Sequence, residues 1–123
     1  MTRKILVIDD EEDLCNLIKL NLESAGEFKV TMAFSGEEGI AKAQQEKFDL
    51  AITDFNMPDM NGEEVIDNLK QINPSLPVLL FSIYHDDNPM FSSNIKKKLS
   101  GIISKPIDHS QLCKTINDVL NKQ

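Results

Sequence analysis

Short apolar segments alternate along the chain with longer segments in which apolar residues recur at every third or fourth position. The short segments cover residues 5–8, 30–33, 50–53, 78–81 and 102–103. Most are apolar throughout, which is typical of parallel strands that helices cover on both faces. The longer segments have the period of amphipathic helices, most clearly over residues 14–25, 65–72 and 112–120.

Residues at the ends of these segments support the assignments. Ser35 followed by Glu38 forms a capping-box pattern, and Asn61 followed by Glu64 is a looser version of the same pattern. Each pair predicts the start of a helix.

The other ends are marked less strongly. Gly26 lies where the first helix should end, and Asp108 can cap the last helix. Residues 83–100 are less regular and predict only a short helix, from about residue 90 to residue 98.

Strand and helix alternate five times. This order predicts an α/β fold with a single-domain, doubly wound, five-stranded parallel sheet of order 2-1-3-4-5, flavodoxin-like, with helices on both faces. The 123 residues suffice for one hydrophobic core and contain no evident linker or repeat. We expect one domain over residues 1–123, with no output domain in this chain.

Charge and composition narrow the possible functions. The 13 basic and 20 acidic residues give a formal charge of −7, which argues against direct nucleic acid binding by this domain. No apolar run is long enough for a membrane span or a signal peptide, so a cytoplasmic location is expected. We interpret the lysines at 96–98 as a solvated helix end, and Cys15 and Cys113 as buried thiols.

Polar residues follow four of the five predicted strands. Asp9 and Asp10 follow the first, Asp54 the third, Ser82 the fourth and Lys105 the fifth. Parallel strands have their carboxyl ends on one edge of the sheet, and this topology places a crevice between strands one and three. We therefore expect the three aspartates to meet there, flanked by Ser82 and Lys105.

Each of these residues has an ordinary alternative explanation. Asp10 or Glu11 could cap the first helix, Asp54 could belong to a turn, Ser82 could bond its own backbone and Lys105 could be a surface lysine. Their joint occurrence at one edge is difficult to explain in this way.

Three carboxylates in one crevice repel, so either a pKa rises or a cation enters, and oxygen ligands in an open site suit Mg²⁺. With Lys105, such a site could support phosphoryl transfer to Asp54.

The sequence resembles the receiver domain of response regulators, the chemotaxis-receiver-like proteins of two-component phosphorelays. The resemblance covers essentially the whole chain, and its motifs lie at residues 5–11, 54–62, 81–82 and 104–106. It implies a phosphoacceptor signalling switch rather than an enzyme, one that catalyses only its own phosphorylation and dephosphorylation.

The resemblance implies a role for each site residue. Asp54 accepts the phosphoryl group, Asp10 binds Mg²⁺ directly, Asp9 assists through water, and the backbone carbonyl of Asn56 is a further metal ligand. Asp54 also contacts the metal.

The resemblance also assigns the groups around the phosphoryl oxygens. Ser82 and Lys105 bind these oxygens, and the bond between Lys105 and Pro106 is expected to be cis. Asn56 and Tyr84 occupy positions that tune the lifetime of the phosphate.

The implied partners are a histidine kinase or histidine phosphotransfer domain as phosphohistidine donor, and an unidentified downstream protein or output domain. No membrane partner is expected. The donor docks on the first helix, which presents Leu14, Cys15 and Ile18. On phosphorylation, Ser82 and Lys105 move toward the phosphate and the face formed by the fourth helix, fifth strand and fifth helix changes.

Three departures from the family pattern concern the face formed by the fourth helix, fifth strand and fifth helix, the output face. Ile83 replaces a small residue, Ile102 replaces an aromatic residue, and residues 98–101 differ from the usual turn. None of them touches the acceptor site.

Three other functions remain as alternatives. A haloacid-dehalogenase-type phosphatase needs a second acid two residues after the nucleophile, where this chain has Asn56. A flavodoxin-type cofactor carrier needs a phosphate loop after strand one, where the acidic residues 9–13 would repel phosphate. A degenerate, phosphorylation-independent receiver is the third, and the complete set of site residues argues against it.

Overall fold

The computed structural model describes residues 2–55, 57–82 and 93–121. Its elements follow one another as β1 (Arg3–Ile8), α1 (Glu12–Ser24), β2 (Phe28–Ala33), α2 (Gly36–Gln45), β3 (Leu50–Asp54), α3 (Gly62–Ile72), β4 (Val78–Ser82), α4 (Ser93–Lys98), β5 (Gly101–Ser104) and α5 (His109–Asn121). All paired strands are parallel, and the sheet order is β2-β1-β3-β4-β5. The predicted fold class is therefore confirmed.

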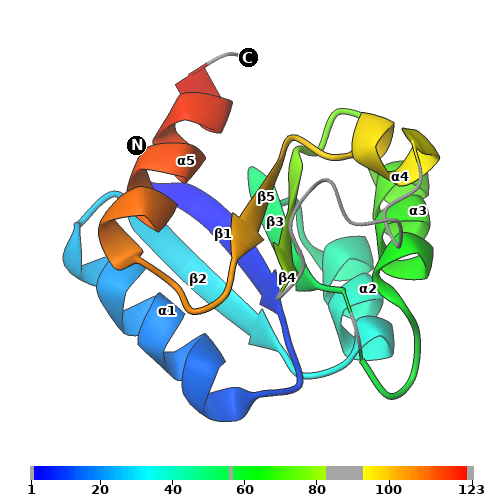
Figure 1. The fold of residues 1–123 in the computed structure, drawn as a ribbon, viewed down its shortest axis with the longest axis horizontal. Coiled ribbons are helices and arrows are strands. Elements are labelled where there is room, and N and C mark those ends of the chain that lie inside the picture. The colour runs from blue at the N-terminus through cyan, green and yellow to red at the C-terminus, as the bar shows by residue number, and fades with distance from the viewer. Residues whose placement is uncertain (1, 56, 83–92, 122–123) are drawn as a thin grey trace.

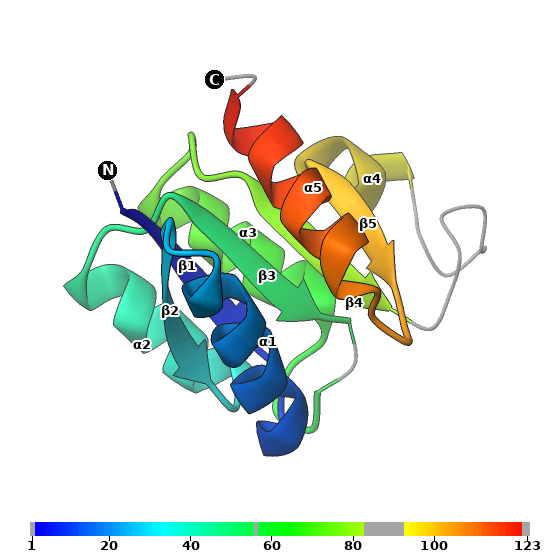
Figure 2. The same ribbon diagram turned by 90° about the vertical axis from the view of Figure 1, so that its left-hand side faces the viewer.

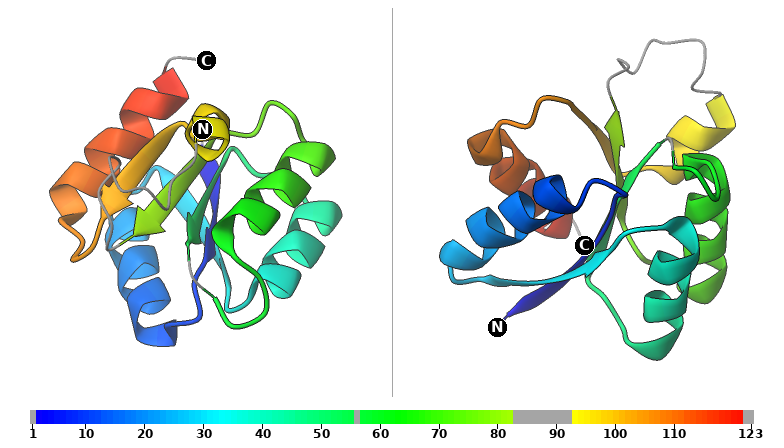
Figure 3. Two further views of the ribbon diagram at one scale, coloured as in Figure 1. Left: turned by 45° about the vertical axis from the view of Figure 1, so that its right-hand side comes forward. Right: turned by 90° about the horizontal axis from the view of Figure 1, so that it is seen from below.

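The sheet separates two layers of helices (Figure 1). Helices α1 and α5 cover one face, whereas α2, α3 and α4 cover the other, as the view from below in Figure 3 shows. Successive residues of β1 point to opposite faces, so Ile5 and Val7 pack in one core cluster and Leu6 and Ile8 in the other. All four side chains are fully buried, which explains why the strand is apolar at every position.

Three strands begin earlier than the apolar pattern predicts, and β5 does so by one residue, at Gly101. Arg3 pairs with Phe28 and Lys4 with Lys29, so β1 and β2 each extend by two residues at their start. Backbone pairing rather than side-chain burial sets the start of β1, because Arg3 is exposed, whereas Phe28 at the start of β2 is buried in the core.

The two predicted helix caps differ in detail. At α3 the capping box is complete, since Asn61 accepts from the backbone N–H of Glu64 and Glu64 accepts from that of Asn61. At α2, Ser35 accepts from the N–H of Glu38, but the Glu38 carboxylate accepts from Phe34 instead of Ser35. The weaker sequence pattern thus forms the more complete cap.

The remaining helix ends agree with the sequence where they are described. Gly26 follows α1 with a positive φ of 84°, and Asp108 accepts from the N–H of Gln111 at 3.2 Å. The fourth helix is observed from Ser93 to Lys98, and residues 90–92 of the predicted helix lie outside the described residues.

Two minor interpretations need correction. Lys98 is not simply solvated, because its Nζ lies 2.6 Å from Asp67 and 3.5 Å from Glu63 on α3. Cys15 is fully buried as expected, but Cys113 is only partly buried. Among the helices of the described residues, none is both long and apolar enough to cross a bilayer.

Candidate functional site

The carboxyl ends of the parallel strands lie along one edge of the sheet (Figure 2). Asp9 directly follows β1, Asp54 ends β3, Ser82 ends β4, and Lys105 directly follows β5. The backbone N–H of Lys105 donates to the carbonyl of Ser82 at 2.9 Å, which joins the last two of these positions. The structure thus places the predicted site residues at the edge where the sequence expects them.

Three aspartates form an acidic cluster at this edge. One carboxylate oxygen from each of Asp9, Asp10 and Asp54 lies within 4.8 Å of the others. Asp9 and Asp54 are buried, whereas Asp10 is exposed. The cluster is therefore open to solvent on the side of Asp10.

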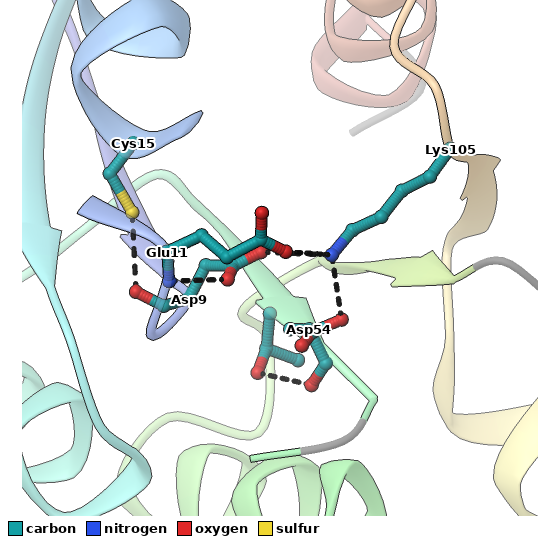
Figure 4. Close-up of polar contacts among 6 residues, drawn as sticks. Asp9, Glu11, Cys15, Asp54 and Lys105 are labelled. Carbon is teal, nitrogen blue, oxygen red and sulfur yellow. Dashed lines mark hydrogen bonds and ion pairs between the residues drawn. The ribbon is translucent and has the colours of Figure 1, made fainter. Parts of the chain in front are cut away.

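Lys105 lies between the carboxylates of the site (Figure 4). Its Nζ is 3.2 Å from Asp54, 3.3 Å from Asp9 and 3.4 Å from Glu11. An ammonium group has three N–H donors, so it can direct one toward each carboxylate. Only 16% of the Lys105 side chain is exposed, which keeps these contacts partly shielded from water.

Backbone interactions hold Asp9 in place. Its carboxylate accepts from the N–H of Glu11 at 2.9 Å, and its carbonyl accepts from the Cys15 thiol at 3.3 Å. Burial raises the pKa of this thiol to about 12, so Cys15 remains a protonated donor. The start of α1 is thereby connected to the acidic cluster.

The environment favours the protonated form of the buried aspartates. Burial raises the pKa of Asp9 to about 6, and the nearby charge of Asp54 adds to this effect. Burial also raises the pKa of Asp54, although Lys105 opposes the shift. For Lys105, burial lowers the pKa, but the carboxylates of Asp54 and Asp9 outweigh it and leave the pKa above its usual value.

These residues fit a hard divalent cation. The donors are carboxylate oxygens, the cluster has one solvent-exposed member, and burial raises the pKa of both buried aspartates, so a bound cation would favour their charged forms. Divalent cations such as Mg²⁺ bind through few carboxylates and retain several waters. The described residues therefore form an acidic pocket that could hold a metal.

Asn56 and Tyr84, which the sequence assigned to the site, lie outside the described residues, as does Ile83, one of the departures from the family pattern. The bond between Lys105 and Pro106 is cis, as expected. Ile102 is partly buried and packs against the core beneath α2, α3 and α4. The contact between Glu11 and Lys105 was not predicted, because only the fold brings residues so far apart in sequence together.

The predicted docking residues of the first helix need correction. Cys15 and Ile18 are fully buried in the core, so neither can contact a partner. The exposed apolar residues of α1 are Leu17, at 46%, and Leu20, at 68%. A shallow groove beside the acidic cluster is lined by Glu11, Leu14, Leu17, Lys105, Pro106, Ile107 and His109.

Comparison with protein families identifies this arrangement. The sequence model of the response regulator receiver domain matches residues 5–117. The chain belongs to this family. Receiver domains are signalling modules of two-component systems, partnered with histidine kinases, and are not classical enzymes. An acidic pocket of this kind is typical of their phosphoacceptor site.

Individual relatives agree with the family. The transcriptional regulatory protein GlrR of Escherichia coli (strain K12) is 30% identical over 118 residues, which cover 96% of this chain and 26% of the relative. The alkaline phosphatase synthesis transcriptional regulatory protein PhoP of Bacillus subtilis (strain 168) is 42% identical over 82 residues, covering 67% of this chain and 34% of the relative. The chain thus spans only about a quarter to a third of these regulators' length.

Solved receiver structures have the same fold. The CheY-like receiver domain protein of Methanospirillum hungatei JF-1 has a TM-score of 0.89 at 29% identity, covering 99% of this chain and 96% of the other. The chemotaxis response regulator CheY4 of Vibrio cholerae has a TM-score of 0.87 at 29% identity, covering 97% and 99%.

Proposed function

We propose that the chain is a phosphoacceptor switch in which Asp54 takes a phosphoryl group from a phosphohistidine donor in a Mg²⁺-dependent reaction. The observation that carries this proposal is the convergence of Asp54 with Asp9 and Asp10 while its Oδ1 lies 3.2 Å from the Lys105 ammonium. A carboxylate nucleophile, a candidate metal cluster and a fixed cation are the groups that phosphoryl transfer to an aspartate requires.

The metal would be held by Asp9, Asp10 and Asp54, and the family resemblance adds the backbone carbonyl of Asn56. Bound there, Mg²⁺ supplies positive charge that offsets the negative charge of the transferring group. Asp54 provides the carboxylate oxygen that attacks phosphorus, and the phosphorus–nitrogen bond of the donor breaks as its imidazole leaves.

Lys105 and Ser82 act on the transferred group. Lys105 exchanges one of its carboxylate contacts for a phosphoryl oxygen, and the Ser82 hydroxyl donates to another. Lys105 begins the β5–α5 connection and Ser82 ends β4, and the Lys105 N–H bonds to the Ser82 carbonyl. Phosphorylation would therefore change the face formed by α4, β5 and α5.

The groove beside the acidic cluster provides a docking surface for the donor. Leu14 and Leu17 of α1 line this groove together with Pro106 and Ile107, and Lys105 belongs both to the groove and to the acceptor site. An apolar helix face of the phosphohistidine donor would pack there and bring its imidazole to Asp54.

The curated relatives suggest what this domain controls. The similar regulators GlrR and PhoP are named as transcriptional regulatory proteins, and this chain corresponds to a fraction of their length. We infer that residues 1–123 act as one receiver domain and control either an output domain or a separate protein.

The proposal is tested by intact-protein mass spectrometry after incubation with Mg²⁺ and acetyl phosphate. We expect one phosphate adduct on the wild-type chain, none on Asp54→Asn and none after chelation of the metal. Asp13→Asn, an exposed change of the same chemistry on the first turn of α1, is the matched control and should retain the adduct.

Beryllofluoride distinguishes a short-lived adduct from an absent one. A Mg²⁺-dependent complex with beryllofluoride, lost in Asp54→Asn, would support the acceptor site even if no adduct accumulates. If neither reagent acts on the wild-type chain, the proposal is wrong and a phosphorylation-independent receiver takes its place.

A further inference from the structure

The side chain of Glu11 does not cap helix α1, which begins at the next residue. Glu11 is the N-cap residue of α1, but its side chain makes no capping hydrogen bond. Its Oε1 instead lies 3.4 Å from the Nζ of Lys105, although 64% of the Glu11 side chain is exposed. An exposed glutamate would be expected to point into water, so the contact with Lys105 is its distinguishing feature (Figure 4).

The charges around Lys105 determine how its contact with Glu11 affects the acceptor site. The acidic cluster consists of Asp9, Asp10 and Asp54, and Glu11 is not part of it. A metal held by the cluster would offset the charge of the three aspartates but not that of Glu11. Lys105 would then retain Glu11 as a carboxylate partner that the metal does not engage.

A phosphoryl group arriving at Asp54 needs the same ammonium. Lys105 Nζ is already within 3.2 Å of Asp54 Oδ1, which places it where the phosphoryl oxygens would come. The Glu11 carboxylate in contact with this ammonium both occupies one of its N–H donors and repels the incoming anion.

We propose that Glu11 is a positioning residue that competes with the phosphoryl group for Lys105 and thereby slows phosphorylation of Asp54. This inference rests on the proposed function of the site. Glu11 acts through Lys105 and does not touch the reacting atoms, so its removal speeds the reaction while leaving the requirement for Asp54 and the metal unchanged.

The expected effect is moderate. Ion pairs with one exposed partner typically change an equilibrium by roughly two- to five-fold, and salt weakens them. Glu11→Gln should therefore raise the second-order rate constant for phosphorylation by acetyl phosphate by roughly two- to five-fold at low ionic strength. The gain should shrink as salt is added.

Two further variants distinguish the contact between Glu11 and Lys105 from a general effect of negative charge near the site. Glu12→Gln removes the same charge one residue away, from an exposed side chain that has no ion pair among the described residues. Glu11→Asp keeps the charge, but the shorter side chain favours capping α1 and draws the carboxylate away from Lys105. If Glu11 acts through the contact, Glu11→Asp and Glu11→Gln both react faster and Glu12→Gln reacts like the wild-type chain.

The experiment measures adduct formation over time for these variants at two salt concentrations, with thermal unfolding to verify that each is folded. The inference is overturned if Glu11→Gln is no faster than Glu12→Gln, if it is slower than the wild-type chain, or if Glu11→Asp behaves like the wild-type chain. A wild-type chain that takes neither phosphate nor beryllofluoride would instead overturn the proposed function, and this inference with it.

Discussion

At the scale of single residues, the acidic cluster conflicts with the stability of the fold. Asp9 is fully buried, and its pKa of about 6 means that ionising it in the folded protein is unfavourable compared with ionising it in the unfolded chain. A cation bound at the acidic cluster, as the proposed function requires, would offset this cost. The metal-free protein should therefore be less stable than its core alone would allow.

This conflict gives a pH dependence with a defined sign. The pKa of Asp9 in the folded protein lies above its ordinary value of 3.8, so the folded state binds this proton more tightly. The destabilising contribution of Asp9 is complete above about pH 6 and disappears as the pH falls toward 4. We expect Asp9→Asn to raise the free energy of unfolding of the metal-free protein by about 2 kcal/mol at pH 7.5, with little change at pH 4.

Urea unfolding in the presence of a chelator measures this effect, and Asp13→Asn provides the control for an exposed aspartate. Added Mg²⁺ should stabilise the wild-type chain and should stabilise Asp9→Asn much less, since binding to the folded state alone adds to its stability. An equal gain for Asp9→Asn at both pH values would contradict the burial argument.

At the scale of elements, hydrogen bonds from α2 to Asp59 join this helix to the segment between β3 and α3. The carboxylate of Asp59 accepts from the backbone N–H groups of Gly36 at 3.1 Å and Glu37 at 2.9 Å, at the start of α2. Both bonds lower the pKa of Asp59, and the bond from Glu37 has the larger effect. Asp59 thus caps α2 from a distant part of the chain and holds the loop that follows the acceptor strand.

Substitution of Asp59 tests this attachment. Asp59→Ala removes both acceptors from the N-terminus of α2 and should lower the free energy of unfolding by about 1 kcal/mol, as the loss of a helix cap does. Asp59→Asn retains one acceptor oxygen and should cost less. Denaturant unfolding gives both values, and exposed Asp118 on α5, changed to Ala, is the control. A cost for Asp118→Ala as large as that for Asp59→Ala would show that the cap contributes nothing specific.

At the scale of the whole molecule, the acceptor site and the proposed docking groove form one continuous region. Lys105 and Glu11 belong to both, while the apolar residues of the groove come from α1 and from the connection between β5 and α5. On the proposed function, small phosphodonors would need only the acceptor site, whereas a phosphohistidine protein would also need the groove. The two kinds of donor can therefore separate chemistry from recognition.

A charged residue in the groove should affect only the protein donor. We expect Leu17→Asp to slow phosphorylation by a histidine kinase or phosphotransfer protein that acts on the wild-type chain by roughly ten-fold or more, as loss of a central apolar contact does. Acetyl phosphate should react at the normal rate. Leu20→Asp, at an exposed apolar position of α1 outside the groove, is the matched control. Equal slowing by both variants would place the docking surface elsewhere.

Much of the fold and the position of the site were predictable from the sequence. The strands buried on both faces are apolar at every position because helices cover both sides of the sheet, and this pattern indicates a parallel α/β fold. Asp9, Asp54, Ser82 and Lys105 each occur where a strand ends, and the rule that parallel strands end on one edge brings them together. These predictions succeeded because each depends on local pattern and on topology.

The tertiary structure alone decided which side chains are accessible and which distant groups meet. Cys15 and Ile18 were assigned to a docking surface from the family resemblance, but both lie on the buried side of α1 that packs on the sheet. The contacts of Glu11 with Lys105 and of Asp59 with α2 join residues far apart in sequence, through side chains that have no local signal. The chain sequence by itself thus determined the fold and the place of the acidic site, whereas packing determined its electrostatics and its surroundings, because both depend on distances that only the folded chain defines.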